Sequence, residues 1–431
     1  MSIASSWGSL TKNKYLTVSP SFLTESEYLI STMSNFIPHG NGRSYGDVAL
    51  NLTGTVLKCT NLDRLIEFDV ESGILICEAG LLLSQIQSFA VPLGWMLPVT
   101  PGTQFVTVAG AIANDIHGKN HHQYGTFGHY VKSITLIRTT GEVFECSPDN
   151  YVDWFKATIG GLGLTGLILK TSIQLKRVSG PWLDTQTLPY NNVRDFLELS
   201  EQSERDWEYT VSWIDADSRG GRGLFMRANH SDCDMPSPKE KSKRRVFFEP
   251  PFSIINGFTL KAFNAGYFYL NKKDISKKKQ HYKPFFYPLD NLLEWNKIYG
   301  PKGFYQYQSV VPFDVAKDAT DAMLKIIKKT GDGSFLSVLK TFGQIPSLGL
   351  LSFVKPGVTL AMDFPNKGAV SEKLFASLDA VVWEAGGRLY LAKDARMPRE
   401  LFEFGYPKFS KFLEYRDPGI SSDMSKRLMG Y

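Results

Sequence analysis

The chain contains 431 residues with a formal net charge of +5 at pH 7, and 43% of its residues are hydrophobic. This length exceeds the size at which one hydrophobic core usually stops growing, so we expect two domains. The modest positive charge, with neither zinc-finger spacing nor an aromatic and basic RNA-binding motif, argues against nucleic acid as a partner.

Four cysteines lie far apart in the chain, at Cys59, Cys77, Cys146 and Cys233. Three of them stand in apolar, strand-like surroundings, which is typical of buried free thiols in a reducing compartment. The N-terminus lacks the apolar core of a signal peptide, and no run of about 18 apolar residues is present. We therefore expect a cytoplasmic protein, with peripheral attachment to the inner face of the plasma membrane left open.

A first glycine-rich loop occupies residues 37–47 and reads IPHGNGRSYGD. It precedes an expected strand at 55–59. Successive main-chain N–H groups in such a loop form a concavity that binds anions, and a pyrophosphate fits it. The spacing lacks the Gly-Lys-Ser/Thr of a Walker loop, and a plain tight turn is the alternative.

After this loop, short strands outnumber helices. Apolar or alternating runs predict strands at 65–68, 74–79 and 134–137, and helical spacing predicts a helix at 82–90. The regular strand and helix alternation of a doubly wound sheet is missing, so the pattern indicates an α+β fold.

Residues 97–130 are rich in glycine and hold four of the chain's seven histidines. Glycine is costly in regular structure, so its density predicts backbone wrapped around a large ligand. The small apolar run at 106–113 would let a flat ring system lie against main chain. The histidines of this stretch could be metal ligands or structural side chains; they are His117, His121, His122 and His129. Gly118 interrupts the helix that would group them, and no Cys or carboxylate cluster completes a ligand shell, which argues against a metal.

Gly161, Gly163 and Gly166 match the spacing of the dinucleotide-binding fingerprint. That fingerprint needs a strand before it and a helix after it, whereas here a helical pattern precedes and a β-rich run follows. We therefore reject a nicotinamide site and expect a turn alongside a cofactor bound elsewhere.

The composition changes near residue 181, where we expect a domain boundary. Two basic clusters follow, at 239–245 and 272–279, and the segment between them carries eight aromatic residues and only two charges. This pattern suits a membrane surface, because Lys and Arg meet lipid phosphate while aromatic rings enter the interface. A core strand pair with solvated ends is the alternative.

The rest of the second region predicts an antiparallel sheet with covering helices at 314–329 and 371–384. Alternation in YQYQ places Gln306 and Gln308 on one strand face, where two amides could orient a polar substrate. Further on, Lys393 follows Tyr390 in an apolar setting, and burial would lower the pKa of such a lysine toward neutrality. A salt bridge to Asp394 is the alternative role for this lysine.

Six motifs, in this order and at these separations, carry a resemblance that covers nearly the whole chain and is weakest from 181 to 284: HGNGRSYGD, PGTQFVTVAGAIANDIHGKNHH, GGLGLTG, YQYQ, MDFP and GGRLYLAKD. They resemble the vanillyl-alcohol oxidase type FAD-binding family, and within it the oxidases of polyprenylphosphoryl ribose. The resemblance implies an FAD-binding domain at 1–181, a substrate-binding domain at 182–387, and a return to the FAD-binding domain at 388–431.

The resemblance also implies the cofactor contacts. FAD would bind, with its pyrophosphate on the first glycine-rich loop, to His39, Gly40, Asn41, Gly42, Arg43, Ser44, Tyr45, Gly46, Asp47, Gly102, Thr107, Val108, Ala109, Gly110, Asn114, Asp115, Ile116, His117, Ile168 and Tyr390. Covalently flavinylated relatives commonly carry a His where this chain has Arg43, so noncovalent FAD is expected.

The implied reaction oxidises the 2-hydroxyl of a polyprenylphosphoryl pentose to a 2-keto sugar, the first half of an epimerisation for cell-envelope glycan synthesis. A short-chain keto-reductase would complete it. Residues 247–269 would guide the lipid from the bilayer. The catalytic residues would be Lys393, Tyr45, His117 and Tyr390, and the substrate-binding residues Gln306, Gln308, Lys340 and Lys393. Ala361 stands where the mycobacterial enzymes carry an inhibitor-reactive Cys. An FAD oxidase of a free sugar or aldonolactone, and a flavin-containing module that binds lipid-linked sugar without oxidising it, are the alternatives.

Overall fold

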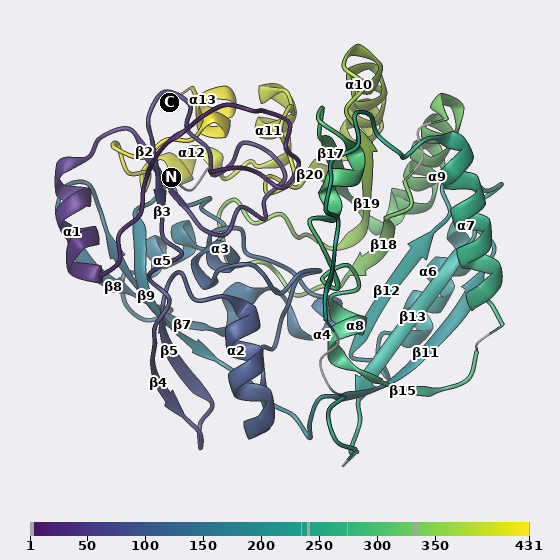
Figure 1. Cartoon of the computed structure of the whole chain (residues 1–431), viewed down its shortest axis with the longest axis horizontal. Helices are drawn as coiled ribbons and strands as arrows, with labels where there is room; N and C mark the ends of the chain where they lie inside the picture. Colours follow the sequence, from purple (N-terminus) through teal and green to yellow (C-terminus); the bar gives the residue numbers. More distant parts are fainter. Residues whose placement is uncertain (1–3, 234, 239–241, 274, 332–333, 431) are drawn as a thin grey trace.

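The computed structural model describes residues 4–233, 235–238, 242–273, 275–331 and 334–430. Two sheets dominate it, one of five strands formed before residue 175 and one of eight strands formed mostly after residue 181 (Figure 1). This mixed architecture, in which short strands outnumber helices, confirms the α+β prediction. The change of sheet falls at the expected boundary near residue 181, although the division into domains stays a prediction.

The five-stranded sheet is antiparallel and supports the glycine-rich centre of the chain. Alternate strand residues such as Leu75 and Cys77 are buried against Ile86, Ala111 and Ile112 of two helices. In sheet order the strands are β4 (Leu65–Asp69), β5 (Ile74–Glu78), β9 (Leu167–Gln174), β7 (Val131–Ile137) and β8 (Val143–Cys146). The neighbouring helices are α2 (Leu83–Ala90), α3 (Val108–Ala113), α4 (His121–Tyr124) and α5 (Val152–Thr158). A strand pair, β6 (Trp95–Met96) and β10 (Lys176–Arg177), and 3₁₀ turns at Val91–Leu93 and Phe127–Tyr130 complete this part of the chain.

A small parallel sheet joins the two ends of the chain, which lie close together in Figure 1. Phe36 donates its N–H to the carbonyl of Gly419 (3.2 Å), and Ser421 donates to the carbonyl of Phe36 (2.9 Å). The elements here are β1 (Leu16–Val18), β3 (Thr55–Lys58), β2 (Phe36–His39), α1 (Leu23–Thr32), α11 (Arg399–Gly405), α12 (Phe409–Leu413) and α13 (Asp423–Met429).

The eight-stranded sheet is antiparallel and has a different cover on each face. Helices α6 (Val193–Ser203), α9 (Phe313–Thr330) and α10 (Ala369–Glu384) bury Phe225 and Met362 on one face, and α7 (Gly257–Asn271) lies against Trp213 and Leu224 on the other. In sheet order the strands are β15 (Lys278–His281), β11 (Trp182–Tyr190), β13 (Gly223–His230), β12 (Tyr209–Ile214), β18 (Ser337–Phe342), β19 (Gly357–Pro365), β17 (Phe304–Val311) and β20 (Arg388–Leu389); α8 (Tyr282–Phe286), the pair β14 (Arg244–Arg245) and β16 (Leu292–Leu293), and the 3₁₀ turn Trp295–Tyr299 lie beside it.

The aromatic segment between the basic clusters does not form the core strand pair that one interpretation of the sequence predicted. Its larger part is the helix α7 and not a strand pair, because Leu260, Asn264 and Phe268 recur every four residues and form one buried stripe. Lys239, Glu240 and Lys241 of the first basic cluster and Asp274 of the second lie outside the described residues.

Candidate functional site

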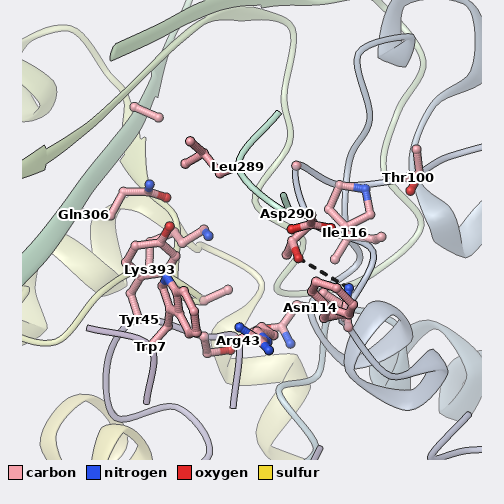
Figure 2. Close-up of a pocket in the computed structure, with 18 of the residues that line it drawn as sticks. Trp7, Arg43, Tyr45, Thr100, Asn114, Ile116, Leu289, Asp290, Gln306 and Lys393 are labelled. Atoms are coloured by element: carbon pink, nitrogen blue, oxygen red, sulfur yellow. Dashed lines mark hydrogen bonds between the residues drawn. The ribbon is translucent and has the colours of Figure 1, made fainter. Parts of the chain in front are cut away.

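A cavity of about 950 Å³ is lined by residues of both large sheets and of the loops between them. Its walls include the first glycine-rich loop, the residues around α3, the strands β17 and β18, and the segment that follows β20. Figure 2 shows Tyr45, Gln306 and Lys393 on one side of the cavity, with Thr100 and Asn114 on the other. Segments that are remote in sequence therefore share one site.

The first glycine-rich loop is held from two directions. On one side Trp7 donates its N–H to the carbonyl of Ser44 (2.8 Å), and Gly8 donates to the carbonyl of Tyr45 (3.2 Å). On the other side a Cβ added to Gly46 would lie 1.7 Å from the carbonyl oxygen of Asp394, so only glycine fits there. This close approach brings Tyr45 beside Lys393.

Arg43 is the cation of this loop. Its guanidinium carbon lies 4.3 Å from the ring centre of Trp7 and 5.3 Å from that of Phe105. Its Nε is buried without a hydrogen-bond partner among the described residues. Burial lowers the pKa of Arg43 and nearby Asp290 opposes this, but arginine stays charged at neutral pH. The cavity wall therefore offers an unpaired donor to an anionic group.

The helix α3 exposes main chain to the cavity because its residues are small. Thr107 begins the helix by accepting the N–H of Gly110 (3.1 Å). Ala109, Gly110 and Ala113 line the cavity with almost no side chain. At the end of the helix, the Asn114 side chain donates to the carbonyl of Gly110 (2.9 Å), and its Oδ1 has no partner among the described residues.

His117 joins the two sheets through a polar cluster. Lys340 Nζ lies 2.9 Å from His117 Nδ1 and donates to the carbonyl of Gly118 (2.5 Å). His117 Nε2 lies 3.2 Å from the side-chain amide nitrogen of Gln308. Burial, followed by the charge of Lys340, holds the pKa of His117 well below its usual range, and burial also lowers the pKa of Lys340. His117 is therefore a neutral imidazole at physiological pH.

A second cluster surrounds Lys393. Asp363 is fully buried, its Oδ1 accepts the Gln306 amide (2.6 Å), and its Oδ2 has no partner among the described residues. Lys393 Nζ lies 3.9 Å from the ring centre of Tyr45. Burial lowers the pKa of Lys393 while the charge of Asp363 opposes it, and burial raises the pKa of Asp363. The pKa of the lysine is thus lowered and that of the carboxylic acid raised, so both groups titrate closer to neutral pH than they ordinarily would.

Tyr390 forms an aromatic wall between the two clusters. Its ring stacks on Phe353 with 4.5 Å between centres and lies 5.5 Å from the imidazole of His117. Its hydroxyl donates to the carbonyl of Asn114 (3.3 Å). Burial raises the pKa of Tyr390, so the phenol stays neutral and positions the groups around it.

The cavity extends from these polar clusters along the eight-stranded sheet, beneath α7. The lining there is mostly apolar and comes from β12, β13 and α7: Trp213, Leu224, Met226, Phe263 and Tyr267. Phe263 is 47% exposed, so this apolar branch reaches the molecular surface. The site thus has a polar end and an apolar exit.

Most of the residues predicted from the resemblance line this one cavity. They are His39, Gly40, Asn41, Gly42, Arg43, Ser44, Tyr45, Gly46, Gly102, Thr107, Ala109, Gly110, Asn114, Ile116, His117, Ile168, Gln306, Gln308, Lys340, Tyr390 and Lys393. Three predicted residues do not line it. Asp47 pairs with Arg427 (2.9 Å), Val108 lies in the core, and Asp115 accepts from Gly128 N–H (3.0 Å) and the Ser352 hydroxyl (2.6 Å).

The proposed salt bridge between Lys393 and Asp394 is wrong. Asp394 instead pairs with Arg427 (2.9 Å) and accepts the main-chain N–H of Met397 (2.8 Å), so its carboxylate points away from Lys393. Neighbours in sequence diverge here because they lie in a tight turn.

The histidines outside the cavity have structural contacts. His122 Nε2 lies 2.8 Å from the carbonyl of Trp207, and His129 Nε2 lies 3.1 Å from that of Pro346. Among the described residues, no three His, Cys, Asp or Glu side chains are grouped as metal ligands would be. The four cysteines are free thiols, and three of them are buried.

Sequence reasoning missed several groups in or beside the cavity. Asp363 lies directly across from Gln306 in the strand pairing, and the signal was available: it is the one charge in the otherwise apolar run VTLAMDFP. Lys119 and Asp290, unlike Asp363, line the cavity itself, and burial lowers the pKa of Lys119 to about 8. Trp7 and Asp290 gave no local signal, because each reaches the cavity through tertiary contacts of loops.

Comparison with known proteins agrees with this geometry. Residues 31–147 match the family model described as an FAD binding domain. The chain is 36% identical over 415 residues to decaprenylphosphoryl-beta-D-ribose oxidase of Mycolicibacterium smegmatis, covering 91% of this chain and 88% of that protein. It is 28% identical to an uncharacterised protein of Streptomyces coelicolor (80% of this chain, 99% of that protein) and 26% identical to a D-lactate dehydrogenase of Anaerostipes hadrus (35% and 32%).

Proposed function

Because the chain belongs to the FAD-binding oxidoreductase family that includes decaprenylphosphoryl ribose oxidase, we propose that it oxidises the 2-hydroxyl of a polyprenylphosphoryl pentose, ribose in the first instance, to a 2-keto sugar. The observation that carries this proposal is the form of the cavity, which has a polar end at Lys393 and an apolar exit at Phe263. A substrate with a small polar head and a long apolar tail matches both ends. A free sugar would use only the polar end.

FAD is the cofactor of this family, and the residues of this chain fit it. Arg43 Nε and Asn114 Oδ1 are buried polar atoms on the cavity wall that lack partners among the described residues. Apart from Gly102 and its two chain neighbours, no described residue has an atom within 4 Å of the place where a Cβ of Gly102 would stand, so main chain there faces open space. Noncovalent binding is proposed because arginine at position 43 offers no nucleophile to a flavin. Bound FAD supplies the acceptor for the hydride that leaves the sugar carbon.

The hydroxyl proton must leave as the carbon loses its hydride, and Lys393 is the proposed acceptor. Its pKa is lowered by burial, so a neutral amine is accessible near physiological pH. Asp363, which does not line the cavity, influences the protonation equilibrium of Lys393 through its charge. Its carboxylate accepts a hydrogen bond from the Gln306 amide (2.6 Å). The ring of Tyr45 lies against the amine, and Lys393 Nζ is 3.9 Å from the ring centre. Lys393 is thus the group that takes or holds the proton, and Asp363 is its positioning residue.

The second polar cluster is proposed to orient the sugar. Gln308 and Lys340 contact the two ring nitrogens of His117, which is a neutral imidazole, and all three residues line the cavity. Basic residues outnumber acidic ones along the wall, which carries the acids Asp290 and Glu294 and the bases Arg43, Lys119, Arg245, Lys340 and Lys393. A cavity with this excess of positive charge favours a phosphodiester as well as a cofactor pyrophosphate.

The product of this proposed reaction is a 2-keto sugar that another enzyme must reduce if the sugar is to be epimerised. A short-chain keto-reductase is the proposed partner, and cell-envelope glycan synthesis the proposed context. The similarity to the mycobacterial oxidase supports a prenylphosphoryl sugar as the substrate, and the reductase and the context are proposals that extend it.

The test is oxidation of three compounds by the purified holoprotein: a short-chain prenylphosphoryl ribose, free ribose and an aldonolactone. We expect at least about 100-fold higher kcat/KM for the prenylated sugar, since each buried methylene contributes about 0.8 kcal/mol, and a product lighter by two hydrogens. Equal turnover of a free sugar or lactone would favour the soluble-substrate oxidase. Binding of the prenylated sugar without oxidation would favour the non-catalytic module.

A further inference from the structure

The helix α7 presents an unusual outer face. One stripe of the helix, Leu260, Asn264 and Phe268, is buried, and Asn264 is anchored by its amide to Asp215 (3.1 Å). A surface helix normally places polar residues opposite such a stripe. Here the exposed side chains include Leu270 (82% exposed) and Tyr269, and the helix carries only one charged residue.

The segment that leads into α7 is also apolar and exposed. Phe247, Phe248 and Phe252 are 86%, 72% and 69% exposed. The segment is fixed at both ends, because Val246 donates its N–H to Leu293 and Ile254 donates to Ile298. Aromatic side chains exposed to this degree, on a backbone that is tied down, indicate a contact surface and not a loosely packed core.

Positive charges outnumber negative ones around this surface, where the acidic side chains are Glu249 and Glu294, the second of which lies 3.8 Å from Arg245. Arg244, Arg245, Lys272 and Lys273 flank the apolar residues on both sides, and the ammonium of Lys272 lies 4.3 Å from the ring centre of Tyr269. Arg245 and Phe263 also line the cavity, so the apolar exit opens within the same surface. A second copy of this chain would bring positive against positive, whereas an anionic bilayer matches both the charge and the exposed rings.

We infer that α7 and residues 244–256, called the docking face below, bind the surface of an anionic lipid bilayer and place the apolar exit of the cavity against it. The aromatic rings enter the headgroup region while the flanking lysines and arginines meet lipid phosphate. No helix of the described residues is long and apolar enough to span a membrane, and α7 with its 15 residues lies on the surface in this arrangement. The lipid-linked substrate of the proposed function gives the docking its purpose, but binding to the bilayer can be measured without it.

The experiment is co-sedimentation of the holoprotein with substrate-free vesicles, either pure phosphatidylcholine or phosphatidylcholine mixed with phosphatidylglycerol. We expect binding to the anionic vesicles that weakens in high salt, and little binding to the neutral ones. The variant Phe247→Ser/Phe248→Ser/Leu270→Ser should lose at least about tenfold in partition, and Lys272→Gln/Lys273→Gln should lose about tenfold, mainly at low salt. Flavin absorbance and the thermal unfolding midpoint verify that each variant is folded.

Matched control variants remove similar side chains elsewhere. Phe22→Ser/Tyr28→Ser alters exposed rings on and beside α1, and Lys132→Gln/Lys170→Gln alters exposed lysines of the five-stranded sheet. Both should bind as the unaltered chain does. Equal loss in controls and docking-face variants, or no sedimentation of the unaltered chain, would overturn the inference. So would a concentration-dependent dimer, seen in analytical ultracentrifugation, that the docking-face variant abolishes. Because no sugar is present, failure here leaves the proposed oxidation untouched, and failure of the oxidation leaves this result untouched.

Discussion

Replacing Lys393 by methionine should lower activity and raise stability at the same time. The methionine fills a similar volume over the Tyr45 ring, where the amine now lies 3.9 Å from the ring centre, so the cavity wall is preserved. What is lost is a proton acceptor at the polar end of the cavity. General base catalysis contributes about 10²–10⁴-fold, so kcat should fall by that factor, equivalent to about 3–5 kcal/mol.

The stability effect follows from the direction of the pKa shift. Burial depresses the pKa of Lys393 in the folded protein, so the unfolded chain binds more protons between that depressed value and the ordinary lysine value. The free energy of unfolding of the unaltered chain therefore rises with pH across this window. At pH values below the window, the cost of burying the protonated Lys393 amine is present in full. The methionine variant has no such penalty, so its advantage should be largest at neutral pH and should vanish toward strongly alkaline pH.

The assay combines kinetics with thermal unfolding of the holoprotein, followed by flavin fluorescence at several pH values. The flavin absorbance spectrum provides the control that FAD is still bound. Full turnover in the variant with FAD bound would refute the role of Lys393 as proton acceptor. A variant that is less stable than the unaltered chain at neutral pH would refute the argument from burial.

Three further predictions concern neighbouring groups. Asp363→Asn removes the charge that supports protonated Lys393, so the rise of kcat/KM with pH should shift to lower pH, and an unchanged pH profile would contradict the pairing. Gly46→Ala places a methyl group 1.7 Å from the Asp394 carbonyl oxygen, so the purified protein should retain little FAD by absorbance, whereas Gly266→Ala, in α7 with open space at the added methyl group, should retain it. Arg427→Leu leaves Asp47 and Asp394 without their cation and should cost about 3–5 kcal/mol, read as a fall in unfolding midpoint; Arg427→Lys should recover only part because it loses the paired hydrogen bonds.

Strand periodicity and motif order accounted for much of the site. Alternation alone placed Gln306 and Gln308 on the cavity face of β17 while Tyr305 and Tyr307 pack toward Phe375 of α10. Alternation is reliable here because one face of the strand is buried under a helix, which fixes its register.

The sequence could not predict which charged side chains would lie beside one another. The adjacent residues Lys393 and Asp394 suggested a salt bridge. In the structure they lie in a turn, and the Asp394 carboxylate pairs instead with Arg427 of α13. Asp363 reaches the Lys393 cluster only through the pairing of β17 with β19. Both contacts depend on tertiary arrangement, which local spacing does not determine.

The aromatic segment shows a different limit. The sequence was interpreted as a membrane-surface segment or a core strand pair, and the helix was missed because its buried stripe at every fourth residue is evident only once burial is known. Likewise Val108 and Asp115 belong to a motif that surrounds the cavity, but Val108 lies on the core side of α3 and Asp115, beyond the end of α3, accepts hydrogen bonds from Gly128 and Ser352.

The most direct test of the proposed oxidation is anaerobic flavin absorbance of the purified protein during titration with a short-chain prenylphosphoryl ribose and, separately, with free ribose. The account predicts that the flavin absorbance bleaches with the prenylated sugar and stays unchanged with free ribose at the same concentration. Flavin that stays oxidised with both compounds would contradict the account.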